Sequence, residues 1–392
     1  MNKTMTYIPR VLLKELKSSA KQYPVTAVLG PRQSGKTTLA QKAFPKKQYI
    51  SLEDLDNRQF AIQDPRGFLN TYKKGAIIDE AQRCPDLLSY MQTQVDHNKK
   101  KGQFIITGSN QFLLEEKITQ SLAGRVSLLR LLPLSLQELK QAKKTPSLNN
   151  MIFKGFYPQL YAENIKANRF FNNYIETYVN KDVRLIKNIS NLSLFNTFLK
   201  LCANRTGQLL NLQSLANDCG ITQNTVKSWL SILENSFVLK RLYPYYKNLN
   251  KRLVKSPKIY FYDTGLLCCL LSIKKPQDLA VHALKGFIFE NFIFTEIEKH
   301  FFNQGEKAPL YFWRDKRGYE IDFLIEPSNL KVIEVKAGQT FSQDFLKNIN
   351  YFSKINPAKK RNYLIYSGAE KQTRKQTSIL PWWDINKVLS AK

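Results

Sequence analysis

The feature that most constrains this chain is a short glycine-containing loop between a predicted strand and a predicted helix. The β-branched strand Val25 to Leu29 leads into a segment that fits the pattern G-x-x-x-x-G-K-[ST]. Such a loop turns backbone N–H groups toward phosphate oxygens, and the start of the following helix adds positive potential. The pattern therefore predicts a nucleotide site in which Lys36 neutralises the terminal phosphates and Thr37 ligates Mg²⁺. The residues predicted to hold the nucleotide are Gly30, Pro31, Arg32, Gln33, Ser34, Gly35, Lys36, Thr37 and Thr38.

A second apolar run ends in two adjacent carboxylates. Residues 76–78 are Ala-Ile-Ile, and Asp79 and Glu80 follow them directly. The carboxyl ends of parallel strands meet at one edge of a sheet, so both side chains are expected beside the phosphate-binding loop. We predict that Asp79 holds Mg²⁺ and that Glu80 orients and deprotonates the attacking water. A solvated strand end is the alternative, and the position after the loop favours the catalytic interpretation.

Two further places are candidates for assisting hydrolysis. A third strand, 104–106, leads to Ser109 and Asn110, and either side chain could lie between the γ-phosphate and the attacking water. Simple turn chemistry explains the same two residues equally well. Arg125 precedes the next strand and is predicted at the mouth of the site, where it would stabilise transition-state charge in its own subunit or in a neighbouring one. A surface ion pair is the alternative for Arg125.

Several segments, in this order, resemble the AAA+-type P-loop ATPases of prokaryotes that carry an uncharacterised C-terminal region. Four of them lie in the first part of the chain: GPRQSGKTTL, GAIIDEAQRCP, FIITGSN and SLAGRVSLLRLLPLSLQEL. Three others resemble the attached region: GFIFENFIFTEI, YFWRDKRGYEIDFLIE and VIEVKAG. The resemblance implies an ATPase core, with ATP and Mg²⁺ as cofactors, coupled to a winged-helix module and a nuclease-like module.

The middle of the chain has the pattern of a helix-turn-helix. A short helix beginning at Leu212, a turn at Gly220 and a second helix capped by Thr222 are followed by two β-rich segments, so a winged helix with residues 248–252 as its wing is expected. The outer face of the second helix carries side chains suited to phosphates or base edges, namely Gln223, Asn224, Lys227 and Ser228. Residues 141–275 hold 20 basic and 6 acidic residues, a net charge of +14, which favours DNA as a partner. A winged helix that only packs against the nucleotide domain is the alternative.

The tail carries carboxylates in an arrangement that resembles the PD-(D/E)XK nuclease core. Glu334 and Lys336 are two residues apart on a predicted strand and therefore share a face. Asp322, on a neighbouring strand, could join them, and Glu290 matches the helical acid of that core, although Ile321 stands where the core has a proline. The predicted metal ligands are Glu290, Asp322 and Glu334, and the predicted catalytic residues are Asp322, Glu334 and Lys336. Two alternatives are an exposed Glu–Lys contact between strands and a nuclease-like fold that has lost cleavage.

These patterns predict an α/β protein with three domains. Residues 25–140 alternate apolar runs with amphipathic stretches, which is typical of a mostly parallel sheet covered by helices. We expect a P-loop, AAA+-like ATPase domain over residues 1–145 and a helical linker with a winged helix over 146–275. We expect an α/β restriction-endonuclease-like domain over 276–392.

Composition limits the class of protein further. The chain is 43% hydrophobic and 23% charged, as in folded proteins, and no apolar stretch reaches the roughly 20 residues that span a bilayer. The N-terminal residues lack the apolar core of a signal peptide, so a cytoplasmic protein with no membrane partner is expected. Five cysteines form no C-x-x-C pair and three histidines have no zinc-type spacing, which predicts reduced thiols and no structural zinc.

The resulting hypothesis is a Mg²⁺-dependent ATP-binding and hydrolysing protein that couples its nucleotide state to a DNA-binding, nuclease-like C-terminal region. A homo-oligomer is compatible with this hypothesis. One alternative is a nucleotide-switched docking protein with an inactive nuclease-like tail, and another is a protein remodeller. Hydrolysis that accelerates with DNA would separate the first hypothesis from the other two. The sequence leaves open the pathway, the preferred DNA, cleavage by the tail and whether Arg125 acts in cis or in trans.

Overall fold

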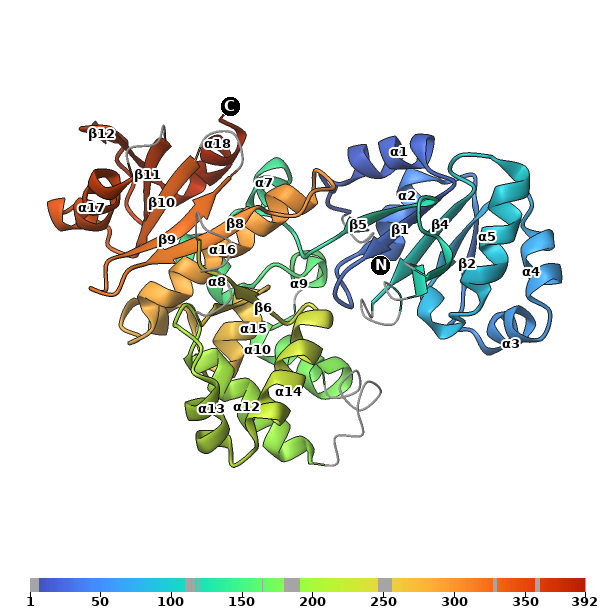
Figure 1. Ribbon diagram of the computed structural model, residues 1–392, viewed down its shortest axis with the longest axis horizontal. Helices are drawn as coiled ribbons and strands as arrows, with labels where there is room; N and C mark the ends of the chain where they lie inside the picture. Colours follow the sequence, from blue (N-terminus) through green and yellow to red (C-terminus); the bar gives the residue numbers. More distant parts are fainter. Residues whose placement is uncertain are drawn as a thin grey trace.

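The computed structural model describes most of the chain as three lobes (Figure 1). The described residues are 7–109, 114, 117–118, 120–163, 165–179, 191–245, 256–326, 330–356 and 360–391. Asn110 and the wing expected over 248–252 therefore lie outside the described residues. Of the helices in the described ranges, none has both the length and the apolar character needed to cross a membrane.

The N-terminal lobe contains a five-stranded parallel sheet in the order β2-β3-β4-β1-β5. Its strands are β1 (Val25–Leu29), β2 (Gln48–Ser51), β3 (Ala76–Asp79), β4 (Phe104–Gly108) and β5 (Val126–Arg130). Helices α1 (Leu13–Gln22) and α2 (Lys36–Ala43) cover one face, and α5 (Leu87–Asn98) packs on the other with α3 (Leu55–Gln63) and α4 (Pro65–Thr71). Strands β1, β3 and β4 are buried throughout because helices cover both faces, and the predicted α/β fold is confirmed. Strand β2 was not predicted, since it is a short edge strand with two exposed residues.

The middle lobe is helical apart from one short hairpin. Its elements are α7 (Leu136–Gln141), α8 (Leu148–Lys154), α9 (Pro158–Ala162), α10 (Ala167–Tyr174), α12 (Leu192–Asn204), α13 (Leu212–Cys219), α14 (Gln223–Asn235), the antiparallel strands β6 (Leu239–Leu242) and β7 (Lys258–Phe261), and α15 (Thr264–Leu270). Helix α13 ends at Gly220, whose φ of +68° favours glycine. Thr222 then caps α14 by accepting a hydrogen bond from the Thr225 N–H at 3.1 Å. Trp229 of α14 packs against α12. Helices α13 and α14 and the turn between them therefore form where the sequence predicts them.

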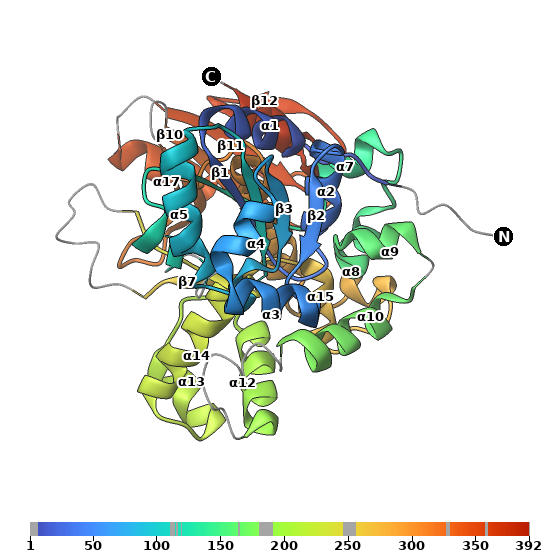
Figure 2. The same ribbon diagram turned by 90° about the vertical axis from the view of Figure 1, so that its right-hand side faces the viewer.

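The C-terminal lobe is built on a six-stranded mixed sheet in the order β12-β13-β11-β10-β9-β8. The strands are β8 (Leu310–Arg314), β9 (Glu320–Ile325), β10 (Leu330–Lys336), β11 (Lys360–Tyr366), β12 (Gln372–Arg374) and β13 (Thr377–Pro381). Helices α16 (Lys285–Phe302) and α18 (Ile385–Ser390) contribute to one core and α17 (Lys347–Ile355) to another, which places them on different sides of the sheet. The sheet and the N-terminal lobe overlap in the turned view, with the helical lobe below them (Figure 2).

Helix α16 connects the three lobes. Residues 288–299 of this helix are all buried, so its polar side chains need partners inside the protein. Glu296 accepts a hydrogen bond from the Leu136 N–H at 2.8 Å, and Asn291 exchanges two hydrogen bonds with the backbone of Phe261 in β7. Glu298 pairs with Lys240 of β6 at 2.6 Å. Phe302, the last residue of the helix, packs in the core of the first sheet, and the helix also packs on β10 of the C-terminal sheet, so it contacts all three lobes.

Candidate functional site

The predicted phosphate-binding loop lies between β1 and α2, in the middle of the first sheet. Gly35 caps α2 with a φ of +92°, a conformation that favours glycine. At Gly30 an added Cβ would lie 2.1 Å from the carbonyl oxygen of Leu131, so the backbone passes too close for any side chain. Lys36 is buried, and its Nζ donates to the carbonyl oxygens of Gly30 and Pro31 at 3.0 and 2.8 Å. The loop thus holds the lysine ammonium over its own backbone, at the start of a helix.

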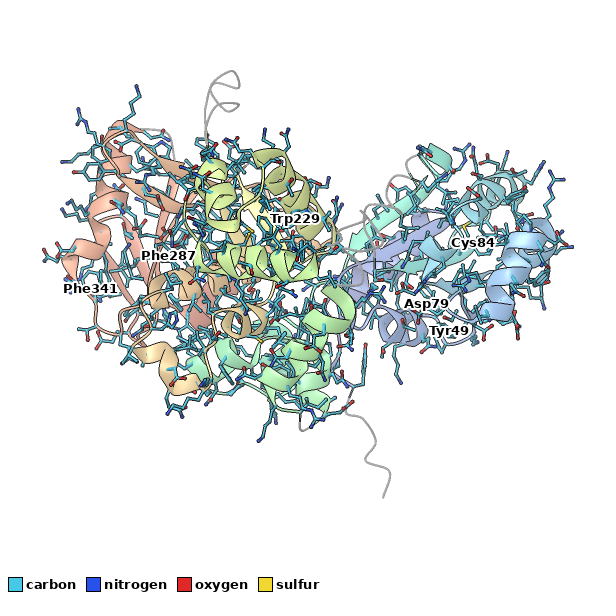
Figure 3. All side chains as sticks on the ribbon, turned by 90° about the horizontal axis from the view of Figure 1, so that it is seen from below. Tyr49, Asp79, Cys84, Trp229, Phe287 and Phe341 are labelled. Carbon is cyan, nitrogen blue, oxygen red and sulfur yellow. The ribbon has the colours of Figure 1, made fainter. Side chains whose placement is uncertain are left out.

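Asp79 lies at the end of β3 and faces the first turn of α2. Thr37 Oγ1 is 3.0 and 3.1 Å from the two carboxylate oxygens of Asp79. Tyr49 Oη donates to the same carboxylate at 2.8 Å, and Thr107 Oγ1 donates to it from β4; Figure 3 labels Tyr49 and Asp79 in this lobe. Burial, and then the hydrogen bond to Asp79, raise the pKa of Tyr49 to about 12, so the phenol stays a donor. A hydroxyl beside a carboxylate is the kind of oxygen donor set that Mg²⁺ takes.

Glu80 follows β3 in a left-handed conformation with a φ of +55°. Its carboxylate accepts a hydrogen bond from Ser109 Oγ at 2.8 Å and another from the side-chain amide of Gln82. Ser109 is therefore placed beside Glu80, and Asn110 lies outside the described residues. The sequence reasoning missed Thr107 and Gln82 as partners of the two acids. Thr107 could have been found, since it directly follows the apolar run 104–106 at the carboxyl end of a parallel strand.

A cavity of about 790 Å³ lies beside these side chains. Its size is in the range of small-molecule sites. One wall comes from the loop and the ends of the strands, and the other comes from the middle lobe. The first wall includes Lys36, Thr37, Asp79 and Glu80, and the second includes Leu134, Pro158, Gln159 and Glu163. A ligand in this cavity would therefore contact both lobes.

Arg10 braces the phosphate-binding loop and was not predicted. It is only 6% exposed, and its guanidinium donates to the carbonyl oxygens of Ser34 and Leu132, each at 2.6 Å. It also pairs with the fully buried Glu138 at 3.0 Å. Arg10 thus ties the loop to the chain that leaves the first sheet. No sequence pattern identifies this contact, because Arg10 and Glu138 are 128 residues apart.

The predicted position of Arg125 at the mouth of the site is wrong. Arg125 precedes β5, which runs parallel to β1, and its carbonyl oxygen accepts a hydrogen bond from Val25 at the start of β1. The loop follows the other end of β1, so Arg125 lies at the opposite edge of the sheet. Its guanidinium forms an exposed ion pair with Asp96, with N–O distances of 2.5 and 2.9 Å. Arg125 is therefore a partner in a surface ion pair, which was the alternative interpretation. The length of β1 separates it from the phosphate-binding loop, so it cannot act in the site of its own subunit.

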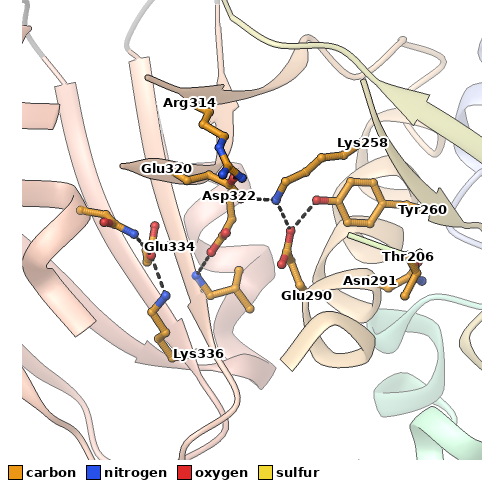
Figure 4. A network of polar contacts seen from close by, with 12 residues as sticks. Thr206, Lys258, Tyr260, Glu290, Asn291, Arg314, Glu320, Asp322, Glu334 and Lys336 are labelled. Atoms are coloured by element: carbon orange, nitrogen blue, oxygen red, sulfur yellow. Dashed lines mark hydrogen bonds and ion pairs between the residues drawn. The ribbon is translucent and has the colours of Figure 1, made fainter. Parts of the chain in front are cut away.

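The carboxylates of the tail gather where β9 and β10 separate. The pairing of these strands runs over three positions and ends at Ile333 and Phe323. Beyond it, the Val335 N–H donates instead to the Asp322 carboxylate at 2.7 Å. Glu334 accepts hydrogen bonds from Lys336 Nζ at 2.7 Å and from the Asn348 amide at 2.9 Å. Figure 4 shows Asp322, Glu334, Lys336 and Glu290 of α16 side by side, so the structure brings together the four residues predicted for the tail.

Burial dominates the electrostatics of this acidic cluster, which we define as Glu290, Glu320, Asp322 and Glu334. It raises the pKa of Glu290 to about 7 and the pKa of Glu334 to about 8, and the Asp322 charge adds to both shifts. The pKa of Asp322 is also raised by burial, against the nearby lysines. Glu290, Asp322 and Glu334 therefore hold protons more tightly than exposed acids do, unless a cation compensates for their burial.

Lys258 of β7 supplies such a cation and was not predicted. Its ammonium is 3.0 Å from Glu290 Oε1 and also pairs with Glu320, whose other partner is Arg314. Tyr260, two residues along the same strand, donates its hydroxyl to Glu290 as well (Figure 4). Among the described residues no group of three or more His, Cys, Asp or Glu side chains is arranged to hold a metal ion. The predicted metal site of Glu290, Asp322 and Glu334 is thus not assembled in this conformation.

Comparisons with known proteins match three successive segments of the chain. Residues 22–140 match the family described as "AAA domain", whereas residues 145–277 and 285–385 match two domains of unknown function (DUF8612 and DUF4143). An uncharacterized protein of Mycobacterium tuberculosis is 29% identical over 318 residues, which cover 80% of this chain and 70% of that protein. An uncharacterized protein of Methanocaldococcus jannaschii is 23% identical over 346 residues, covering 79% and 74%.

Several solved structures are similar to parts of this chain. The Walker-type ATPase of Pyrococcus abyssi has a TM-score of 0.44 and 14% identity, covering 66% of this chain and 94% of that one. The AAA match covers the whole first sheet and its loop, so the N-terminal lobe contains an AAA-type, P-loop ATPase-like domain. Proteins with such domains bind ATP and hydrolyse it with Mg²⁺.

Proposed function

We propose that this chain binds Mg²⁺-ATP in the cavity beside Gly30–Thr38 and hydrolyses it with Glu80 as the base. The observation that carries the proposal is the convergence of Lys36, Thr37, Asp79 and Glu80 on one cavity at the carboxyl edge of the sheet. Lys36 would bind the terminal phosphates, while Thr37 and Asp79 would hold the Mg²⁺ that offsets their charge. Glu80, oriented by Ser109, would take the proton of the attacking water.

Calorimetry and steady-state hydrolysis on native protein and three variants test this proposal. Lys36→Ala should abolish ATP binding, because the phosphates lose their cation. Glu80→Gln should keep the affinity but slow turnover by a factor on the order of 100 or more, since only the base is removed. Glu53→Gln is the matched control, because Glu53 lines the same cavity but pairs with Arg83 at 3.5 Å. Native protein that binds no ATP, or equal turnover in Glu80→Gln and Glu53→Gln, contradicts the proposal.

We further propose that the nucleotide state is coupled to DNA binding by the middle lobe, in which α13, α14 and the β6–β7 hairpin act as a winged helix. Two observations support DNA as the partner: Gln223, Asn224 and Lys227 are exposed on α14, and residues 141–275 carry a net charge of +14. The cavity adds support for the coupling, because its second wall belongs to the same lobe. A nucleotide could therefore change how the lobes pack.

Charge reversal on α14 tests the DNA surface. Lys227→Glu should weaken binding to duplex DNA and lower the slope of log affinity against log salt by about one, the contribution of one phosphate contact. Lys14→Glu, an exposed position on α1, changes the net charge equally and should leave the salt slope unchanged. Equal effects of the two variants in fluorescence anisotropy would show that only net charge matters.

For the C-terminal lobe we propose a nuclease-like module that docks on DNA. Support comes from the placement of Asp322, Glu334 and Lys336 on adjacent strands with Glu290 on the helix beside them. Nicking of plasmid DNA with Mg²⁺ that is equal in native protein and Asp322→Ala would mark a contaminant. Nicking that disappears in Asp322→Ala would assign hydrolysis to this lobe.

A second candidate function is a nucleotide-switched docking protein whose tail does not cleave. Lys258 and Lys336 favour this second candidate, because they pair with carboxylates of the acidic cluster where a cleaving site would need a metal ion. The ATPase rate separates the two candidates, since a DNA-processing enzyme should hydrolyse ATP faster with DNA and a switch should not.

A further inference from the structure

Lys258 is one of the few cations in the described part of the chain whose side chain is buried in an ion pair. Its side chain is almost fully buried, at 2% exposure, and it pairs with two carboxylates of another lobe. The ammonium contacts Glu290 of the helix at 3.0 Å and Glu320 at the start of β9. It therefore lies between Glu290, the helical acid of the predicted metal site, and Glu320, which is two residues before Asp322 on β9.

The charges around this position are nearly balanced without any metal ion. Glu290, Glu320, Asp322 and Glu334 supply at most four negative charges, and the cations in contact with them are Lys258, Arg314 and Lys336. The formal sum is therefore no lower than −1, so a divalent cation added to the site would make it positive. One oxygen, Oε2 of Glu334, is buried and has no hydrogen-bond partner. This oxygen is therefore free to ligate a metal ion if Lys258 leaves the cluster.

We propose that the ammonium of Lys258 occupies the cation position of the acidic cluster and closes the C-terminal lobe to divalent metal ions in this conformation. A metal ion could enter only if Lys258 left, because two cations in contact with Glu290 would repel each other. The nuclease-like lobe is then in a state that cannot perform metal-dependent hydrolysis. This inference goes beyond the proposed ATPase and DNA-binding functions, and it does not depend on nucleotide.

Because Lys258 belongs to the middle lobe, its contact with Glu290 depends on how the middle hairpin packs against α16. Phe261, three residues after Lys258 on strand β7, makes two hydrogen bonds with Asn291 of α16. These bonds hold the strand against the helix. It also pairs with β6, which follows α14, the candidate DNA-binding helix. A shift of this hairpin relative to α16 would withdraw Lys258 from Glu290. The acidic cluster would then need another cation.

Binding of Mn²⁺ without nucleotide tests the proposal. All variants carry Asp79→Asn, which removes the candidate metal ligand of the ATP site. Calorimetry and electron paramagnetic resonance should detect no Mn²⁺ site in otherwise native protein. Lys258→Met should create one site, and Mn²⁺ should raise its melting temperature. Adding Asp322→Asn should remove that site again.

Lys240→Met is the matched control, since Lys240 lies on the same hairpin and pairs with Glu298 of the same helix. It should bind no Mn²⁺. If Lys258→Met folds only with metal, that metal-dependent folding would itself support the proposal. Lys258→Gln, which retains a hydrogen-bond donor for Glu290, would then replace it in the binding measurements. The proposal is overturned if the Lys258-containing protein binds Mn²⁺ through Asp322. It is also overturned if neither Lys258 variant binds or folds with Mn²⁺. These measurements are made without ATP, so a failure of the proposed ATPase function would leave their outcome unchanged.

Discussion

The brace between Arg10 and Glu138 provides the sharpest test of how this fold holds its phosphate-binding loop. Replacing Arg10 by Met removes a guanidinium that is 6% exposed and leaves Glu138, which is fully buried, without its cation. Breaking a buried ion pair from one side costs about 3 to 5 kcal/mol. Glu138 keeps hydrogen bonds from the N–H groups of Val11 and Ser135 at 2.7 and 2.8 Å, so we expect the lower end, about 3 kcal/mol.

Thermal unfolding followed by circular dichroism measures this effect. A loss of about 3 kcal/mol should lower the melting temperature of the N-terminal lobe by roughly 10 °C. ATP affinity should fall as well, because the carbonyl oxygen of Ser34 in the loop loses its donor. The double variant Arg10→Met/Glu138→Gln should recover part of the stability, since no unpaired charge then remains buried.

Arg125→Met is the control for this prediction. Arg125 makes a bidentate pair with Asp96 in the same lobe, but both groups are exposed to solvent. Screening by water should make its loss nearly undetectable in the same melting experiment. If Arg10→Met and Arg125→Met shifted the melting temperature equally, burial would not set the strength of these pairs and the reasoning would fail.

Three further predictions concern other parts of the chain. Ser109→Ala should lower the ATP turnover number about tenfold, less than Glu80→Gln, because it removes only the hydroxyl that orients the base. Thr222→Ala should cost about 1 kcal/mol through loss of the α14 cap, and faster hydrogen exchange in the first turn of α14 would detect it, whereas unchanged exchange would argue against the cap. Burial raises the pKa of Asp263 to about 6 from 3.8, so its contribution to stability is full below pH 3.8 and is lost as the pH rises through 6. The melting temperature of native protein relative to Asp263→Asn should therefore fall between pH 4 and pH 7, and a difference that is constant with pH would contradict this.

The sequence by itself determined the features that depend on neighbouring residues. Gly30 and Gly35 can both be identified from their spacing, and the left-handed backbone of the loop requires Gly35 locally, whereas the need for glycine at position 30 comes from the Leu131 carbonyl oxygen beside it. Asp79 and Glu80 follow a fully buried strand, so their position at the sheet edge follows from the parallel α/β pattern. Gly220 and Thr222 end one helix and begin the next for equally local reasons.

Only the tertiary structure decided which distant groups meet. Arg125 precedes its strand and so lies at the edge opposite the loop, a fact that depends on the direction of β5 beside β1. Lys258 reaches the acidic cluster from another lobe, and Arg10 reaches Glu138 across 128 residues. A buried charge must find a partner in three dimensions, whatever its position in the chain, because water no longer solvates it. Periodicity and motif spacing do not indicate which distant partner a buried charge contacts. The pairs Arg10–Glu138 and Lys258–Glu290 could therefore be identified only from the folded chain.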